Sequence, residues 1–357
     1  MKVSGYILLL LFFCNFIAIG QNKVEYSAEI TTWFHDKQAA VSITFDDADY
    51  TQYQFAYPIL DKYHLKATFS LVGEWTKDKP TYSAEEGMFK IKKMGWNEIL
   101  ELSKKGHEIA AHGYEHKRYG KRLSTDILSL QMKKIKDLIE NKIHKTVYTL
   151  HYPYSFTSDS IVKGADKAGF LFGRTQGDHN YNNPKFNNRL LLNSRAIINN
   201  TNPDTIEFKQ WVNEAKGKWL ILMYHRLFTK DAFEMSIMKN HNVTNTYSLY
   251  PDTFDKQMKY LASSGYWIAP VADIGRYAIE RENTLLKMSI CKKSIKIKTI
   301  TNLDENTYNI PLTLKVKLPW KKVKVSGSNN DGIFEVINNA ILIDFLPGKT
   351  IKIRKKK

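Results

Sequence analysis

The chain of 357 residues is long enough for two domains, or for one large α/β domain with an appendage. Its hydrophobic fraction of 43% and charged fraction of 25% are ordinary for a globular protein and exclude a wholly disordered chain. The formal net charge of +17 fits an anionic partner, such as nucleic acid, a membrane surface or an acidic glycan, or a solvated basic face without a specific ligand.

The first twenty residues have the pattern of an export signal. Lys2 precedes an apolar stretch from Tyr6 to Ile19, and Ala18 and Gly20 supply the small residues that precede a cleavage site. A membrane-spanning helix needs about 20 apolar residues, so this stretch is short for one, although an uncleaved anchor is the alternative. We therefore expect a signal peptide at residues 1–20 and an exported protein, periplasmic or extracellular, without stable membrane association after cleavage.

The cysteine content predicts a core that is stabilised by side-chain packing and not by disulfide bonds. The chain has two cysteines, Cys14 and Cys291, and Cys14 lies within the apolar N-terminal stretch. Signal cleavage would leave one cysteine, so we expect neither an internal disulfide nor a cysteine zinc site. Export also argues against nucleic acid as the partner of the basic charge.

Short apolar strands alternate with amphipathic helices between residues 24 and 285. Strands are expected at residues 40–45, 66–72, 107–111, 147–150 and 219–223. Helices are expected at residues 55–63, 96–105, 125–141, 160–168 and 253–263. This alternation predicts an α/β fold, either a barrel or a wound sheet.

Residues 286–357 have a different sequence pattern, in which apolar and polar side chains alternate. The pattern predicts a small all-β sandwich, and Asn338-Asn339 is expected to form the turn of a hairpin between residues 333–337 and 340–345. This segment holds 16 basic and 5 acidic residues, a net charge of +11. Its alternating lysines fit either an exposed sheet face with protected edges or a surface for an anionic glycan.

Acidic and histidine side chains follow three of the predicted strands. Asp46 and Asp47 come after the first strand, His112 and His116 after the third, and His225 after the strand at 219–223. In barrels and wound sheets such positions meet at one edge. Two adjacent carboxylates fit a metal ligand beside a base, the histidine pair fits a divalent metal, and His225 fits a general acid or base. A solvated loop, a helix cap and hydrogen-bonded rim histidines are the structural alternatives.

In their order, spacing and placement these motifs resemble the polysaccharide deacetylases, the NodB-homology group or carbohydrate esterase family four. The matching segments are Thr44-Phe45-Asp46-Asp47, His112-x-x-x-His116, Tyr152-Pro153-Tyr154 and Leu222-Met223-Tyr224-His225. The resemblance runs from about residue 41 to 277 and implies a deformed (β/α) barrel at residues 24–285. With the C-terminal pattern, we expect a signal peptide, a deacetylase domain and a β-sandwich domain at 286–357.

The resemblance also implies a set of functional residues. Asp47, His112 and His116 would hold one divalent metal, zinc foremost, with cobalt, nickel or iron as alternatives. The general base that deprotonates water would be Asp46, and the backbone N–H of Tyr154 would help to hold the tetrahedral oxyanion. The remaining role, protonation of the leaving group, would belong to His225.

The sequence departs from the family in three places. Gly113 stands where the family often has Ser or Thr, and the fourth motif has no clear match except Asp178. His151 stands where the family has an arginine that pairs with the base. If His151 pairs with Asp46, its pKa should rise above about 6.5 and activity should decline earlier on the alkaline side. Alternatively, His151 points elsewhere and another group tethers Asp46.

The function expected from these features is a metal-dependent hydrolase that removes acetyl groups from an acetylated polysaccharide or oligosaccharide, with N-deacetylation favoured over O-deacetylation. The alternative is a non-catalytic glycan-binding protein with a degenerate barrel, or a helper in which the sandwich alone binds glycan. Because the functional residues end at His225, deletion of residues 286–357 is expected to leave activity on a small substrate largely intact.

Overall fold

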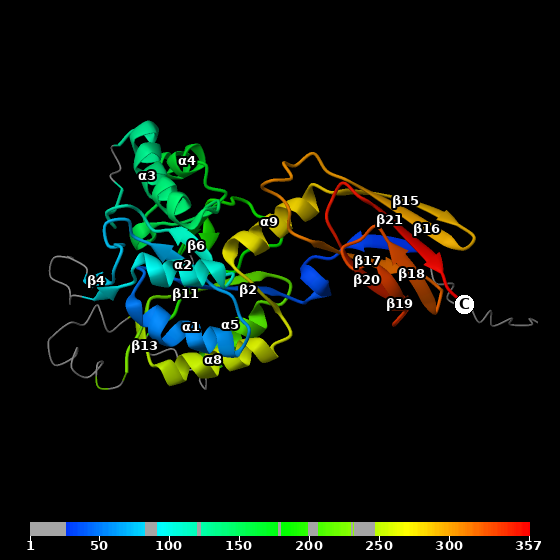
Figure 1. Ribbon diagram of the computed structural model, residues 1–357, viewed down its shortest axis with the longest axis horizontal. Coiled ribbons are helices and arrows are strands. Elements are labelled where there is room, and N and C mark those ends of the chain that lie inside the picture. The colour runs from blue at the N-terminus through cyan, green and yellow to red at the C-terminus, as the bar shows by residue number, and fades with distance from the viewer. Residues whose placement is uncertain are drawn as a thin grey trace, which may run out of the picture.

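The computed structural model describes residues 26–82, 91–119, 123–177, 180–198, 206–229, 231 and 247–357. The expected signal peptide and Asp178 lie outside the described residues. Among the helices that are described, none combines the length and the apolar character that a membrane span requires. Figure 1 shows an α/β body joined to a second body made of strands.

A nine-stranded sheet forms the centre of the α/β body. Its order is β10–β11–β2–β3–β6–β7–β8–β9, with β14 also beside β2, and every pairing in it is parallel. The strands are β2 (Ala40–Phe45), β3 (Thr68–Leu71), β6 (Glu108–Ala111), β7 (Thr149–His151), β8 (Phe172–Thr175), β9 (Leu192–Asn193), β10 (Arg195–Ala196), β11 (Trp219–Tyr224) and β14 (Trp267–Ile268). Only Ser194 separates β9 from β10, so the sheet nearly closes on itself, which confirms the predicted barrel class.

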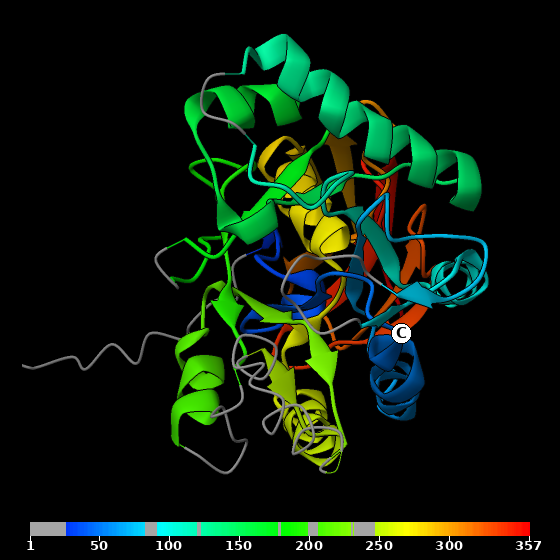
Figure 2. The same ribbon diagram turned by 90° about the vertical axis from the view of Figure 1, so that its left-hand side faces the viewer.

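Helices surround this sheet, as Figure 2 shows. They are α1 (Tyr57–Lys62), α2 (Trp96–Lys104), α3 (Thr125–Ile143), α4 (Asp159–Lys167), α5 (Ile206–Glu214), α8 (Pro251–Ser263) and α9 (Val271–Glu282), and the π-helix η2 (Gln52–Ala56) leads into α1. The longest, α3, begins where the Ser124 hydroxyl accepts the N–H of Ile127 and ends at left-handed His144. It buries residues three or four apart, as an amphipathic helix does: Leu128, Met132, Ile135, Ile139 and Ile143.

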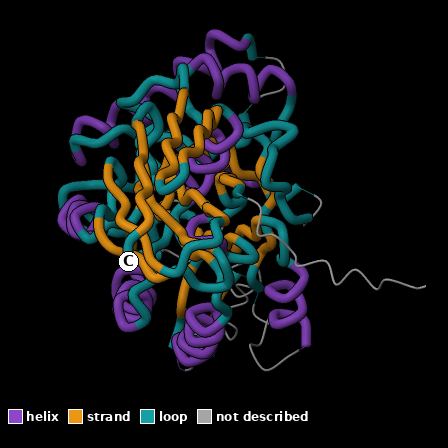
Figure 3. The backbone as a smooth tube through the Cα atoms, turned by 90° about the vertical axis from the view of Figure 1, so that its right-hand side faces the viewer, coloured by secondary structure: helices purple, strands orange, loops and turns teal. Residues whose placement is uncertain are grey.

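The second body consists of two antiparallel sheets. The first sheet has the order β1 (Ser27–Ile30), β17 (Leu312–Lys317), β20 (Ala340–Phe345). The second has the order β15 (Leu285–Cys291), β16 (Ser294–Ile300), β21 (Thr350–Lys355), β18 (Lys322–Ser326), β19 (Gly332–Glu335). Alternate side chains of both sheets meet in one apolar core, an arrangement that fits the predicted small all-β domain. Figure 3 views the molecule from this side.

Two details of this body differ from the expectation. Strand β1 belongs to the sandwich although it lies in the segment assigned to the barrel, because its backbone pairs with β17. The predicted hairpin forms only at its turn, where Ile337 and Ala340 pair antiparallel, and the two strands do not continue that pairing. Asn338 and Asn339 do form a tight turn with φ of 51° and 59°, but β19 pairs with β18 whereas β20 pairs with β17. The chain therefore crosses from one sheet to the other at this turn.

The two bodies share apolar surface at α9. Tyr277 is fully buried and belongs to the core of the sandwich, and its hydroxyl donates to the carbonyl of Thr31 at 3.0 Å. Its ring centroid lies 5.0 Å from that of Trp267, which in turn lies 5.8 Å from Phe34. Tyr277, Trp267 and Phe34 thus add to the core of the sandwich from the barrel side, so the two bodies are packed against each other at α9.

Candidate metal centre and active site

The predicted functional side chains converge at one end of the barrel. Parallel strands β2, β6 and β11 end at the same edge, which brings Asp46, Asp47, His112 and His225 together. They line a cavity of about 250 Å³ with His116 and Tyr154. Its other lining residues are Arg118, Tyr152, Ser155, Gln176, Met223, Arg226 and Tyr247. Among the predicted site residues that are described, His151 alone does not line this cavity.

Asp47, His112 and His116 form the candidate metal site. One ligand atom of each lies within 4.8 Å of the others, and Asp47 Oδ1 is 3.6 Å from His112 Nε2 and 3.3 Å from His116 Nε2. His112 Nδ1 must donate to the carbonyl of His151 at 2.9 Å, which leaves the Nε2 lone pair facing the cluster. Burial lowers the pKa of His112 to about 4, so its ring is neutral, as a ligand must be. Two imidazoles and one carboxylate suit a first-row divalent ion.

The backbone at the end of β2 turns both aspartates toward the cavity. Asp47 and Ala48 have φ of 75° and 54°, a left-handed conformation that non-glycine residues seldom adopt. Such strain costs about 1 kcal/mol or more per residue and persists only where the surrounding structure enforces it. Gln52 helps to do so, because its side-chain amide donates to the carbonyls of Asp46 at 2.5 Å and His225 at 2.6 Å. Gln52 belongs to none of the motifs found in the sequence.

A buried charge network holds the other oxygen of Asp47. Arg226 Nη2 lies 3.3 Å from Asp47 Oδ2, and Arg226 Nε lies 2.9 Å from Asp49 Oδ2. Lys93 Nζ contacts the second Asp49 oxygen at 2.5 Å. Burial raises the pKa of Asp47, but Lys93 and His116 outweigh it and hold that pKa well below its usual range. None of the sequence motifs includes this network, although Asp49 lies two residues after Asp47 and Arg226 directly follows His225.

Asp46 is the most tightly held carboxylate of the site. Its Oδ1 accepts from His151 Nδ1 at 2.8 Å and from the Ser70 hydroxyl at 2.9 Å, and its Oδ2 accepts from Arg174 Nη2 at 2.5 Å. Burial raises the pKa of Asp46, but Arg174, His112 and the His151 hydrogen bond together lower it well below its usual range. Asp46 is therefore an anion with a fixed orientation.

The expected pairing of His151 with Asp46 is present, but the expected rise in its pKa is wrong. His151 is completely buried, and that burial, together with nearby Arg174, lowers its pKa to about 3 despite the hydrogen bond to Asp46. A neutral His151 ring can still donate its Nδ1–H to Asp46 Oδ1, so it accounts for this hydrogen bond. His151 thus lies behind Asp46 as a positioning residue and does not supply the positive charge.

Arg174 supplies that charge from the next strand. In the parallel pairing of β7 with β8, His151 and Arg174 are register partners, so both side chains reach the same aspartate. Arg174 is 1% exposed, and Ser194 lies 3.3 Å from its Nη1. A signal was present in the sequence: a charged residue in the apolar segment Phe170 to Thr175, at a strand end.

His225 and Tyr154 both line the cavity. His225 Nε2 is 4.0 Å from Asp46 Oδ2, its ring packs 4.6 Å from that of Tyr247, and burial lowers its pKa. Tyr154 has φ of 55°, and its half-exposed ring lies 4.7 Å from the ring of His116. The site therefore has an ionised carboxylate and an imidazole facing one space beside the candidate metal ligands.

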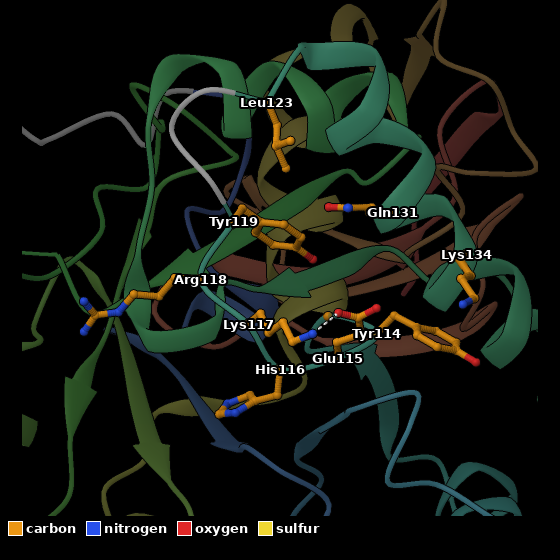
Figure 4. A pocket seen from close by; sticks show the side chains of 10 residues that line it. Tyr114, Glu115, His116, Lys117, Arg118, Tyr119, Leu123, Gln131 and Lys134 are labelled. Atoms are coloured by element: carbon orange, nitrogen blue, oxygen red, sulfur yellow. Dashed lines mark ion pairs between the residues drawn. The ribbon is translucent and has the colours of Figure 1, made fainter. Parts of the chain in front are cut away.

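Gly113 is explained by the backbone of the histidine loop. Its φ is +77°, and a Cβ there would lie 3.0 Å from Pro153 Cγ. Serine or threonine would be strained in this conformation. The same loop lines a neighbouring hollow of about 240 Å³, drawn in Figure 4, and His116 and Arg118 line both spaces.

Comparison with known proteins agrees with these observations. Residues 35–173 match the family model for polysaccharide deacetylase, a segment that contains Asp46, Asp47, His112, His116 and His151. This part of the chain is therefore similar to the polysaccharide deacetylase domain. The match ends one residue before Arg174 and does not reach His225.

Among curated relatives, YxkH of Bacillus subtilis (strain 168) is 28% identical over 151 residues, or 42% of this chain and 50% of that protein. The poly-β-1,6-N-acetyl-D-glucosamine N-deacetylase of Staphylococcus aureus (strain MRSA252) is 29% identical over 143 residues, or 38% of this chain and 47% of that protein. The chain thus spans about half the length of these relatives.

Solved structures of related proteins include the Streptococcus pyogenes deacetylase PplD in complex with acetate, at 25% identity and a TM-score of 0.36. That alignment covers 43% of this chain and 62% of the other. A family 4 acetyl xylan esterase from Clostridium thermocellum, in complex with cobalt, is 20% identical with a TM-score of 0.41 and aligns over 66% of this chain and 89% of the other.

Proposed function

We propose that this protein is a metal-dependent deacetylase that removes N-acetyl groups from an acetylated amino-sugar polymer or oligomer. The observation that carries the proposal is the placement of Asp46 and His225 in one cavity beside the Asp47, His112 and His116 cluster, with Asp46 Oδ2 only 4.0 Å from His225 Nε2. Asp46, which accepts a proton as a carboxylate, and His225, which donates one when its ring is protonated, therefore face the same reacting centre.

A divalent ion held by Asp47, His112 and His116, zinc foremost, would polarise the acetyl carbonyl and acidify a water. The ionised Asp46 takes the proton of the attacking water, and Arg174 and His151 keep its carboxylate oriented. His225 donates a proton to the leaving nitrogen, and the backbone N–H of Tyr154 stabilises the developing oxyanion. Acetate and a free amino sugar are the products.

Two considerations favour N-acetyl substrates over O-acetyl ones. Several of the curated relatives are named poly-β-1,6-N-acetyl-D-glucosamine N-deacetylases. An amine leaving group also requires protonation more strictly than an alcohol does, and His225 is placed to supply it. The predicted export signal would put the substrate outside the cytoplasm. The non-catalytic alternative loses one of its two supports, because Arg174 replaces the charge missing at position 151.

Acetate release tests the proposal. The metal-loaded full chain is incubated with oligomers of β-1,6-linked N-acetylglucosamine and, separately, with O-acetylated xylan oligomers, and Asp46→Asn serves as the control. We expect faster release from the N-acetylated substrate and a loss of at least about 100-fold in the control. Absence of hydrolysis with zinc, cobalt, nickel and iron would favour the glycan-binding alternative. Faster release from xylan would assign an O-acetyl esterase.

A further inference from the structure

The outer face of the five-stranded sheet carries a dense group of cations. Strict alternation along the strands sends the apolar side chains into the sandwich core and the polar ones outward. Six outward and exposed cations lie on four adjacent strands, and we call them the basic face: Lys287, Lys296, Lys298, Lys324, Lys352 and Arg354.

From this group we infer that the basic face is a binding surface for an anionic polysaccharide. The register places like charges directly opposite each other in three cross-strand pairs: Lys287 with Lys298, Lys296 with Lys352, and Lys324 with Arg354. Like charges in such positions destabilise a sheet. A bound polyanion removes this repulsion.

Within the described residues no carboxylate compensates this charge. None of the six cations forms an ion pair with a described acidic side chain. The acidic residue on this face, Glu335, is paired with Lys322 at 2.6 Å and so is already neutralised. Much of the net charge of +11 on residues 286–357 is therefore presented on one surface.

Protection of sheet edges does not account for the pattern. Lysine on an edge strand prevents pairing with another chain, but the edges of this sheet are β15 and β19. Five of the six cations lie on the interior strands β16, β21 and β18, which have no free edge. The charge thus stays on the flat face, where a ligand can lie across the strands.

The basic face is turned away from the barrel. It is the other sheet, through β17 and β20, that contacts η1 (Phe34–Asp36) and α9. Figure 1 agrees, with β17 and β20 between the barrel and β16. A long polymer can therefore lie along the basic face without obstruction by the barrel.

The chemistry of the face selects the kind of polyanion. Cations lie about 4.8 Å apart across strands and about 6.7 Å apart along them, a lattice for closely repeated anionic groups. The outward side chains of these strands include no aromatic ring, so bases of single-stranded nucleic acid have nothing to stack on. Five of the six are lysine, whose ammonium is a point charge on a flexible stem and needs no planar partner, so the face suits anionic groups repeated along a polymer. A chain of carboxylated sugars fits best.

Binding of the full chain to polygalacturonate tests the inference without any turnover, so its outcome is separate from that of the proposed deacetylation. The face variant replaces Lys296, Lys324, Lys352 and Arg354 by Gln. The control variant makes the same charge change on exposed helix lysines of the barrel: Lys104, Lys105, Lys163 and Lys259. Neutral dextran of similar length, poly(dT) and vesicles of anionic lipid are the comparison ligands.

We expect polygalacturonate to bind, more weakly as salt rises, and the face variant to lose about tenfold in affinity while the control loses less than twofold. No binding at low salt, or equal losses in the two variants, would overturn the inference. Tighter binding of poly(dT) or of anionic vesicles than of polygalacturonate would also overturn it. Thermal unfolding gives an independent readout: at low salt without ligand, the face variant should melt at a higher temperature than wild type.

Discussion

Arg174 Nη2 lies 2.5 Å from Asp46 Oδ2, and this contact between two buried side chains replaces the arginine that is absent at position 151. The cation comes from β8, one strand further along the sheet, and it reaches the carboxylate beside His151. The candidate base is thereby kept ionised through a contact that the family motifs do not specify.

Loss of Arg174 should raise the pKa of Asp46. In the Arg174→Gln variant the base is then protonated at low pH, so the acidic limb of the pH–rate profile moves to higher pH. Because a buried ion is left unpaired, stability should also fall by about 3–5 kcal/mol. Arg174→Lys keeps the charge and should show a smaller shift. The measurements are rate against pH and thermal unfolding of each variant.

The His151→Arg variant also tests how the cation beside Asp46 affects this carboxylate. Since His151 is neutral and Arg174 already supplies the charge, the single variant should not extend activity to more alkaline pH. Combined with Arg174→Gln it should restore part of the lost activity and reverse the shift of the acidic limb. A double variant no better than Arg174→Gln alone would mean that the position of the cation, and not its presence, matters.

Metal analysis of variants distinguishes the proposed metal ligands from the proposed general base. Asp47→Ala, His112→Ala and His116→Ala should each lose the bound ion, because two donors cannot hold it. Asp46→Asn should keep the ion and lower kcat by at least about 100-fold. The ion content of purified variants is the measurement, and full occupancy in either histidine variant would contradict the ligand assignment.

Asp49 is expected to act on the metal site through Arg226. Asp49→Asn removes the charge that orients Arg226 and Lys93, so Asp47 is held less firmly and metal affinity should fall about 10- to 100-fold. Activity at saturating metal should be changed much less. Titration of the apoprotein with zinc gives the affinity, and Asp61→Asn on the exposed side of α1 is the control. Equal affinities in the two variants would show that Asp49 only supports folding.

The expectation for deletion of residues 286–357 changes with the structure. The deletion removes β17, the partner of β1, and uncovers Tyr277, Trp267 and Phe34. Burial of one such aromatic side chain contributes about 3 kcal/mol or more. We therefore expect the truncated protein to aggregate or to melt at a much lower temperature, measured by light scattering and thermal unfolding. A monodisperse fragment with unchanged melting temperature would contradict this.

Glu280 should make stability depend on pH. It is 1% exposed, its Oε2 accepts the N–H of Ile310 at 2.9 Å, and burial raises its pKa to about 7. The unfolded carboxyl ionises near 4.5, so the folded state binds the proton more tightly and stability declines as pH rises from about 4.5 to 7. Glu280→Gln should lessen this decline and stabilise the protein at pH 8 by up to about 3 kcal/mol. Parallel unfolding curves for the two proteins would contradict the assignment.

Local patterns in the sequence were enough for most of the elements. The apolar run at Ala40–Phe45 and the helical period at Thr125–Ile143 predict the ends of β2 and α3 to within two residues. Burial of a whole strand, or of one face of a helix, shows in the spacing of apolar residues that are close together in the sequence. The strand-end positions of Asp46, Asp47, His112 and His225 likewise predicted one cavity, since parallel strands end at a common edge.

Features that depend on pairing between distant segments could not be predicted from the sequence. The turn chemistry of Asn338-Asn339 defines a tight turn but not which strands it joins, so the hairpin was predicted where the chain changes sheets. Strand β1 pairs with β17 across nearly the whole chain. The alternating lysines could be read from the sequence, but their like-charge opposition exists only once the register is set.

The sequence by itself determined the barrel class, the candidate metal ligands and the need for a cation beside Asp46. Only the tertiary structure decided which residue supplies that cation and which charge state His151 adopts. The physical reason is that a pKa in a buried site depends on desolvation and on every charge nearby, and those distances are set by the register of β7 and β8.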